Sequence, residues 1–208
     1  MKKILIVNNN MKIGGVQRAL INLLKEINNR YDITLFLFDL TGEYYDYIPK
    51  NVKVIGASSI LKVLGISVDE SRKLGIKFFL AKIFFAFLTK IIGNKITIPL
   101  ICKFEPRLGN YDVAISYMQS SPNRNFYGGT NEFVLSRVDA KKKISFVHCD
   151  YENYGGDLKY AIMMYKGFDK IAFCSKGCMN AFLKLLPQFA SKSKVVYNCM
   201  DINEINKL

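Results

Sequence analysis

A double glycine, Gly14-Gly15, is the first place in this sequence where the backbone could bind a ligand. It follows the apolar run KKILIV and three asparagines, and apolar residues then recur at helical spacing over 16–27. A helix N-terminus presents unbonded N–H groups that attract anions, and glycine lets a phosphate approach them closely. Glycine also has a steric use in a strand-to-helix turn, where it supplies a positive φ or close packing. The stretch leaves both explanations open.

Further polar side chains occur where predicted strands end. They lie at 8–10, 119–121, 148–150 and Ser175. Because parallel α/β sheets bind ligands at the carboxyl ends of their strands, we expect these groups to meet in one cleft. The alternative is that a chain simply becomes polar where a strand ends. His148 belongs to this set and is the only histidine of the sequence.

The elements that must position these residues alternate along the chain. Helix-like runs cover 15–27 and 176–187, and the β-branched and aliphatic runs typical of buried strands cover 3–7, 32–38, 52–57, 111–118, 142–149, 168–175 and 193–199. Nearly continuous apolar strands between helices indicate a parallel sheet that is covered on both faces. The sequence therefore predicts an α/β fold, a doubly wound Rossmann-like sheet with helices on both faces.

Size and cysteine content narrow the class of protein. The chain has 208 residues, of which 50% are apolar, enough for one substantial domain. Its five cysteines are scattered without a C-x-x-C pair, which favours reduced thiols in a cytoplasmic protein. With a single histidine we expect no metal site. The N-terminal apolar run is too short for a signal peptide and fits a first strand.

The formal net charge of +13 favours anionic partners. Nucleic acid, acidic lipid headgroups and phosphorylated substrates all fit such a charge, and so does a solvated basic surface without a partner. The basic residues are dispersed and no RNA- or DNA-binding motif is present. We therefore expect no nucleic-acid partner.

Residues 70–103 form an unusual aromatic and basic segment. Its stretch 76–92 is long enough to suggest a membrane span, but Lys77, Lys82 and Lys90 interrupt it, and a charge within a span is costly. These lysines do not fall on one helix face. The segment fits a helix packed in the core with extended lysines, which we favour, or a surface helix that touches an anionic bilayer.

Four stretches in order resemble the N-terminal half of GT-B glycosyltransferases of family 4. The first 27 residues are similar to a family start whose loop reads G-G-[AV]-[EQ]-R, and KKISFVHCDY is similar to a fifth strand that ends in histidine. FDKIAFCSKGCMNAFLKLLP and SKVVYNCMDINEI resemble the next two strands, with the helix between them. Gln17, Gln119 and Met200 differ from the commoner family residues. These differences concern the acceptor rather than the fold.

The resemblance implies roles for particular residues. The Gly14-Gly15 loop would cover the donor diphosphate or the acceptor when the cleft closes, and His148 would be the catalytic residue near the transferred sugar. The remaining candidates would bind the acceptor: Asn10, Arg18, Gln119, Asp150 and Ser175. The donor substrate would be a nucleotide sugar, with no other cofactor and no metal.

The resemblance also implies a domain plan. Residues 1–200 would be the acceptor-side domain and 201–208 the start of an interdomain linker, with the C-terminal donor domain absent. The fragment alone would then be inactive. The whole enzyme would be a retaining hexosyltransferase that acts on a lipid-linked or polysaccharide acceptor, as in capsule or cell-wall assembly. We expect it in the cytoplasm, with a peripheral position on the inner face of the cell membrane left open.

Two other classes of protein remain as alternatives. A basic α/β module without chemistry would bind an anionic membrane or a nucleotide. A Rossmann oxidoreductase would use Asp39, which ends the second strand as a ribose-binding acid does. The first turn lacks the G-x-G-x-x-G spacing of such enzymes, which disfavours the oxidoreductase.

Overall fold

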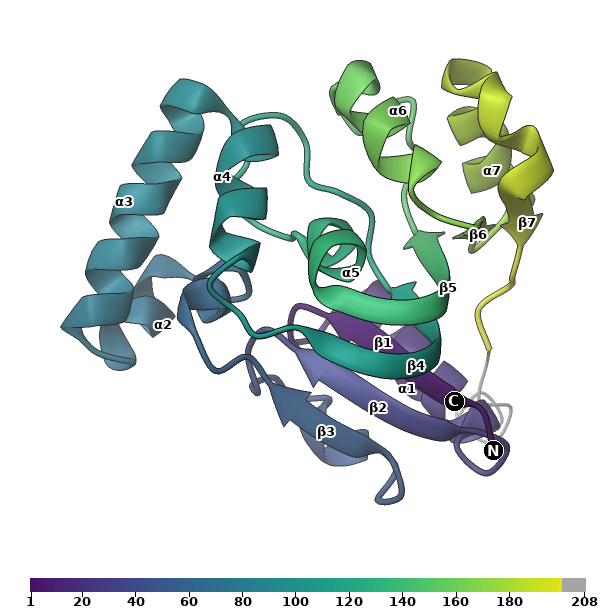
Figure 1. Ribbon diagram of the computed structural model, residues 1–208, viewed down its shortest axis with the longest axis horizontal. Coiled ribbons are helices and arrows are strands. Elements are labelled where there is room, and N and C mark those ends of the chain that lie inside the picture. Colours follow the sequence, from purple (N-terminus) through teal and green to yellow (C-terminus); the bar gives the residue numbers. More distant parts are fainter. Residues whose placement is uncertain (200–208) are drawn as a thin grey trace, which may run out of the picture.

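The computed structural model describes residues 1–199 of the chain. It contains a 7-stranded sheet in the order β3-β2-β1-β4-β5-β6-β7, in which every neighbouring pair is parallel (Figure 1). The strands are β1 (Lys3–Asn8), β2 (Asp32–Leu37), β3 (Lys53–Gly56), β4 (Leu108–Ser116), β5 (Val138–Val147), β6 (Lys170–Phe173) and β7 (Ser193–Val195). The predicted parallel sheet is confirmed. The predicted linker at 201–208 lies outside the described residues.

Helices cover both faces of the sheet. They are α1 (Gly15–Ile27), α2 (Val68–Lys73), α3 (Ile76–Ile92), α4 (Asn94–Cys102), α5 (Thr130–Arg137), α6 (Leu158–Lys166) and α7 (Lys176–Leu185), with short 3₁₀ turns at Tyr45–Tyr47, Ile60–Leu64 and Pro187–Lys192. In Figure 1, α5 lies in front of the strands and α1 behind them. The doubly wound α/β architecture predicted from the sequence is therefore the one observed.

Two hydrophobic cores result from the alternation of side chains along the strands. In β1, Leu5 and Val7 point into the core that α3 to α7 cover, whereas Ile4 and Ile6 point into the core that α1 covers. All four side chains are at most 7% exposed. Burial on both faces explains why β1 reads as a continuous apolar run.

The chain changes direction at the centre of the sheet. From β1 it crosses by α1 to β2 on one side, and from β4 it crosses by α5 to β5 on the other. β1 and β4 are neighbours, and the loops that leave their carboxyl ends run in opposite directions along the sheet. This position is the topological switch point of a doubly wound sheet. The residues after β1 and β4 are therefore placed where ligands bind in doubly wound folds.

The aromatic segment at 70–103 is divided among α2, α3 and α4. Gly75 and Gly93 separate these helices with φ values of 115° and 85°, a conformation that glycine adopts without strain. One face of α3 packs on the domain through Phe85, while the neighbouring Phe84 points to solvent and is 59% exposed. Core packing, which we expected for the segment, thus describes one face of α3. No helix within residues 1–199 has the length and apolarity to cross a membrane.

Candidate functional site

A pocket of about 330 Å³ opens at the carboxyl edge of the sheet, beside the end of β1 and the start of α1. Three separate segments form its wall: the loop from β1 to α1, the turn before α2, and the loop from β4 to α5. The lining residues are Asn10, Lys12, Ile13, Gln17, Gly65, Ile66, Ser67 and Tyr127. The pocket therefore lies beside the switch point.

Asn10 is the predicted site residue that lies in this pocket, and it is 2% exposed. Its Nδ2 donates to the carbonyl oxygen of Gly65 at 2.6 Å, and its Oδ1 accepts from the backbone N–H of Lys12 at 3.2 Å. Burial raises the pKa of Tyr127, which a hydrogen bond with Asn10 partly opposes. Asn10 thus holds the three segments of the wall together, and burial keeps Tyr127 a neutral hydroxyl.

An ion pair forms one side of the pocket. The Nζ atom of Lys12 lies 2.5 Å from the carboxylate of Glu70 in α2, and both side chains are partly exposed. Burial alone would raise the pKa of Glu70, but hydrogen bonds from Lys12 and from the backbone of Ser67 lower it to about 2. Glu70 is therefore ionised at neutral pH and balances the charge of Lys12.

The start of α1 lacks a cap. Gly14 precedes the helix and has no side chain to cap it, no side chain among residues 1–199 accepts a hydrogen bond from the first turn, and that turn contains no acidic residue. The first helical hydrogen bond in this turn runs from the N–H of Arg18 to the carbonyl oxygen of Gly14 at 3.0 Å. The N–H groups of residues 15–17 precede it and need partners from outside the helix.

The backbone conformation does not require glycine at position 14 or at position 15. Gly14 has φ 177°, an extended conformation that any residue adopts, and a Cβ at Gly15 would meet nothing within 4 Å. A Cβ at Gly14 would meet the Oε1 atom of Gln17 at 2.5 Å, the end of a flexible side chain. The steric explanation for the double glycine thus finds no support at Gly15, where space is open.

Gln17 connects the uncapped helix start with the pocket. It is 8% exposed and lines the pocket, and no hydrogen bond to its side-chain amide is present within residues 1–199. The amide is reached from the pocket rather than sealed in the core, so it is available to a polar ligand. Arg18, the next residue, is exposed on α1, and its guanidinium carbon lies 6.0 Å from the centroid of the Tyr44 ring.

His148 follows β5 and contacts another predicted residue, Gln119. The backbone N–H of His148 donates to the Oε1 atom of Gln119 at 3.2 Å. The imidazole stacks on Phe146 with centroids 4.3 Å apart and lies 4.8 Å from the Tyr117 ring. Its Nε2 atom is buried without a hydrogen-bond partner among the described residues.

Burial determines the charge of His148. It lowers the pKa of the imidazole from 6.5 to about 4, so the ring is neutral at pH 7. Neighbouring strands lie about 4.8 Å apart, and β4 is the one strand between β1 and β5, so the end of β5 is roughly 10 Å from the end of β1. A sugar with a diphosphate is long enough to reach from one to the other.

Asp150 and Ser175 use their side chains locally. Asp150 is exposed and accepts hydrogen bonds from the N–H of Glu152 at 3.0 Å and the amide of Asn153 at 2.7 Å. Ser175 caps α7, because its Oγ accepts from the N–H of Cys178 at 3.1 Å. The predicted polar residues therefore do not meet in one cleft. Asn10 lies in the pocket, Gln119 and His148 contact each other, and Asp150 and Ser175 form hydrogen bonds within their own turn or helix.

A second hollow, of about 370 Å³, lies at the opposite edge of the sheet. Its wall includes Asp112 and Lys141, which form an ion pair at 2.7 Å. Since parallel sheets bind ligands at the carboxyl ends of strands, the pocket beside α1 is the candidate site. Within residues 1–199, no three His, Cys, Asp or Glu side chains lie together as a metal site would require.

Lys12, Gln17 and Tyr127 line the pocket but were not among the residues predicted to bind ligands. Gln17 had a local signal, since it lies two residues after the double glycine, in the first helical turn. Tyr127 had none, because it lies more than a hundred residues from the double glycine along the sequence.

Comparison with known proteins supports the fold. No family model and no curated protein match the chain. The structure of HepE from Anabaena in complex with UDP-glucose aligns with a TM-score of 0.52 and 16% identity, over 98% of this chain and 45% of HepE. HepE in complex with UDP and glucose aligns with a TM-score of 0.49 and 17% identity, over 98% of this chain and 46% of that one. The chain thus spans less than half of HepE, and the first of these likenesses shows that it shares a Rossmann-like, doubly wound fold with part of that protein.

Proposed function

We propose that this chain is the acceptor-side half of a retaining glycosyltransferase that uses a nucleotide sugar. The observation that carries the proposal is the uncapped start of α1 beside the pocket at the switch point. The order of the four sequence motifs supports family 4. The acceptor in this proposal is lipid-linked or a polysaccharide, and no metal takes part.

The start of α1 suits the diphosphate of such a donor. Free N–H groups at residues 15–17 and the positive end of the helix dipole attract negative charge. The open space at Gly15 lets a phosphate oxygen come within hydrogen-bond distance of the backbone. Charge grows on the diphosphate as the sugar leaves, so these donors stabilise the transition state more than the ground state.

His148 acts as a neutral hydrogen-bonding group in this proposal. With a pKa of about 4 the imidazole is not an acid at neutral pH, but a neutral ring both donates and accepts. It would bind a hydroxyl of the transferred sugar through the nitrogen that has no protein partner. Asn10, Arg18 and Gln119 would form the acceptor side, while Asp150 and Ser175 would act through the turn and helix that they cap.

The choice of donor class is supported by the structural comparison. HepE is a protein crystallised with UDP-glucose, and its fold is shared along almost the whole of this chain. In the proposed enzyme, most contacts to the nucleotide and the sugar come from a second domain, which we infer from the family resemblance.

Titration of the 208-residue chain with UDP, UDP-glucose and inorganic pyrophosphate, followed by amide NMR spectra, tests the proposal. We expect the largest shifts at the amides of residues 14–17, with pyrophosphate reproducing most of the UDP effect. Absence of shifts there, with all three compounds, would contradict the proposal.

A pair of glycine variants separates ligand binding from folding. Gly15→Val places a side chain in open space, so it should fold normally and block the approach of phosphate. Gly177→Val is the matched control, because Gly177 lies in the first turn of α7, where a Cβ would meet only the Ser175 Oγ at 3.7 Å. We expect the first variant to lose the shifts and the second to keep them. Equal shifts in both would contradict the assignment.

A further inference from the structure

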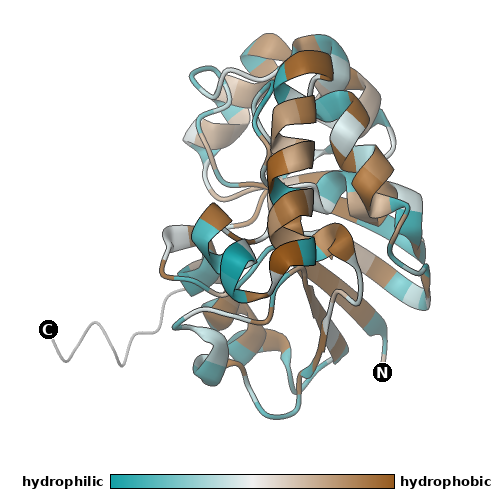
Figure 2. Ribbon diagram, turned by 90° about the vertical axis from the view of Figure 1, so that its left-hand side faces the viewer, coloured by the Kyte–Doolittle hydropathy of each residue, from teal (hydrophilic) through white to brown (hydrophobic). Residues whose placement is uncertain are grey.

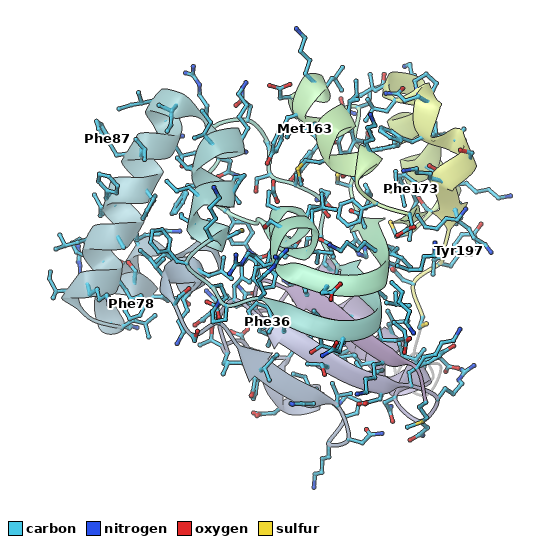
Figure 3. All side chains as sticks on the ribbon, viewed as in Figure 1. Phe36, Phe78, Phe87, Met163, Phe173 and Tyr197 are labelled. Carbon is cyan, nitrogen blue, oxygen red and sulfur yellow. The ribbon has the colours of Figure 1, made fainter. Side chains whose placement is uncertain are left out.

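The outer face of α3 is an exposed apolar stripe. Its residues recur three and four positions apart, as one face of a helix requires, and each is 45% to 70% exposed: Ile76, Leu80, Ile83, Phe84, Phe87 and Ile91. α3 is the brown helix that faces the viewer in Figure 2, and Phe87 stands on its outer side in Figure 3. We name these six residues the α3 stripe.

The stripe is separate from the face of α3 that stabilises the fold. Phe85 and Thr89 lie on the opposite face at 7% and 0% exposure, and Phe85 packs against the Phe126 ring with centroids 6.5 Å apart. The helix thus has apolar residues on both its inner and its outer face, and the outer face has no covering element among the described residues. A continuous exposed apolar surface of this kind marks an interaction site.

The lysine in the middle of α3 points away from the stripe. Lys82 is 6% exposed, its Nζ donates to the carbonyl oxygen of Val63 at 2.8 Å, and it lies 4.8 Å from the centroid of the Phe126 ring. Burial lowers its pKa to about 8. No charge therefore interrupts the stripe, which the sequence alone did not reveal.

Positive charge borders the stripe on both sides. Lys77 and Lys90 are exposed and, at 100° per residue, fall on opposite edges of the α3 stripe. Neither α3 nor α4 contains an aspartate or glutamate. The surface is apolar along its centre and basic along its edges.

We propose that the α3 stripe docks on an anionic lipid bilayer, with α3 in the plane of the interface. Apolar side chains would enter the boundary between headgroups and acyl chains, and the flanking lysines would meet the acidic headgroups. A second copy of the chain fits less well, because two faces bordered by lysine would meet in a protein of net charge +13. The proposal does not depend on the glycosyltransferase assignment.

Co-sedimentation of the 208-residue chain with lipid vesicles tests this docking. We expect binding to vesicles of phosphatidylcholine mixed with phosphatidylglycerol, weaker binding at high salt, and little binding to phosphatidylcholine alone. Salt screens the lysine contribution but leaves the apolar contribution. Absence of binding to the anionic vesicles at low salt would overturn the proposal.

Variants of the stripe identify the surface responsible. Phe84→Ser with Phe87→Ser should lower vesicle binding by about tenfold or more, because two exposed rings no longer enter the lipid. Met163→Ser on α6, where the side chain is 60% exposed, is the control and should bind as the wild type does. Thermal melting of both variants should match the wild type. Unchanged binding of the phenylalanine variant would overturn the proposal.

Charge reversal provides an independent variant. Lys77→Glu with Lys90→Glu should lower binding by at least about 25-fold, since each lysine near an acidic surface contributes roughly fivefold. Lys176→Glu with Lys166→Glu is the matched control, because these exposed lysines occupy the first turn of α7 and the last turn of α6. Equal losses in both pairs would show attraction by net charge alone and overturn the docking.

Analytical ultracentrifugation distinguishes the bilayer from a second copy. We expect a monomer at the concentrations used for vesicle binding. A dimer that the phenylalanine variant converts to a monomer, in a chain that ignores anionic vesicles, would assign the α3 stripe to self-association and overturn the bilayer proposal.

Discussion

The imidazole of His148 lies against two aromatic rings, and this position links its chemistry to the stability of the fold. Its Nε2 atom is buried without a partner, and burial keeps the ring neutral at pH 7. A histidine that served packing alone would gain nothing from an unsatisfied nitrogen. The arrangement instead resembles that of a group held in position for a ligand.

We predict that His148→Phe changes the pH dependence of stability. The imidazole has a pKa of about 4 when folded and 6.5 when unfolded, so the unfolded state binds the proton first as pH falls. Wild-type stability should therefore drop between pH 6.5 and pH 4 by up to about 3 kcal/mol relative to the variant, because one pKa unit corresponds to about 1.4 kcal/mol. Urea unfolding at several pH values measures this difference.

At neutral pH the same variant should unfold with a free energy equal to that of the wild type, or higher by about 1 kcal/mol, because the phenyl ring keeps the stacking and removes the unpaired nitrogen. A loss of several kcal/mol at neutral pH would instead indicate a structural histidine.

Turnover should respond to a different change at this residue. In a protein that joins this chain to a donor domain, His148→Ala should lower turnover by about a hundredfold or more, because a positioned polar group near the reacting centre is lost. The melting temperature should also fall, because the ring that stacks on Phe146 is lost, so the rate is compared at a temperature where both proteins are folded. Steady-state kinetics measures the effect, and a near wild-type rate would refute the proposed role.

At the scale of elements, α3 places two consecutive phenylalanines in different environments: Phe85 is buried and Phe84 is exposed. Phe85→Ala removes a ring that packs in the core, so we expect a loss of about 3 to 5 kcal/mol in the free energy of unfolding. Phe84→Ala removes an exposed ring and should cost less than about 1 kcal/mol. Chemical denaturation of the two variants provides the comparison. Similar losses in both would mean that α3 is not oriented as described.

The strands and two helices could be predicted because local pattern determines them. Each strand is an apolar run between polar turns, and α1 and α7 show helical spacing. The segment at 70–103, interpreted as one helix, is divided among α2, α3 and α4, and α5 and α6 were not predicted. In α5, the buried set includes the polar residues Thr130, Asn131 and Glu132, so no apolar period appears in its sequence.

The candidate site was predictable only in part, because only some of its residues have a local sequence signal. The double glycine and Asn10 form a local signal that follows the first strand. Tyr127 reaches the pocket through tertiary contacts, and the burial of Lys82 depends on Val63 and Phe126. Ser175 was chosen from its place at a strand end, but a serine before a helix is also a common cap, and the structure shows it capping α7.

At the scale of the whole molecule, the sheet order explains why distant residues share one edge. β1, β4 and β5 are neighbours in the sheet. The double glycine follows β1, Gln119 follows β4 and His148 follows β5, so these residues lie along a single line of strand ends. The α3 stripe belongs to the insertion between β3 and β4, which also supplies Gly65, Ile66 and Ser67 to the wall of the pocket.

We expect the 208-residue chain to unfold in a single cooperative transition and to transfer no sugar by itself. Its two cores are complete, whereas the proposed donor contacts lie in a second domain. Calorimetry and an assay with a panel of nucleotide sugars measure the two properties. Transfer by this chain alone would contradict its assignment as one half of an enzyme.

The most direct test of the central claim is the transfer of labelled sugar by a protein in which a donor domain follows this chain. The account predicts transfer from a nucleotide sugar with retention of anomeric configuration, loss of about a hundredfold in Gly15→Val, and wild-type activity in Gly177→Val. No transfer from any nucleotide sugar, or equal activity in the two glycine variants, would contradict it.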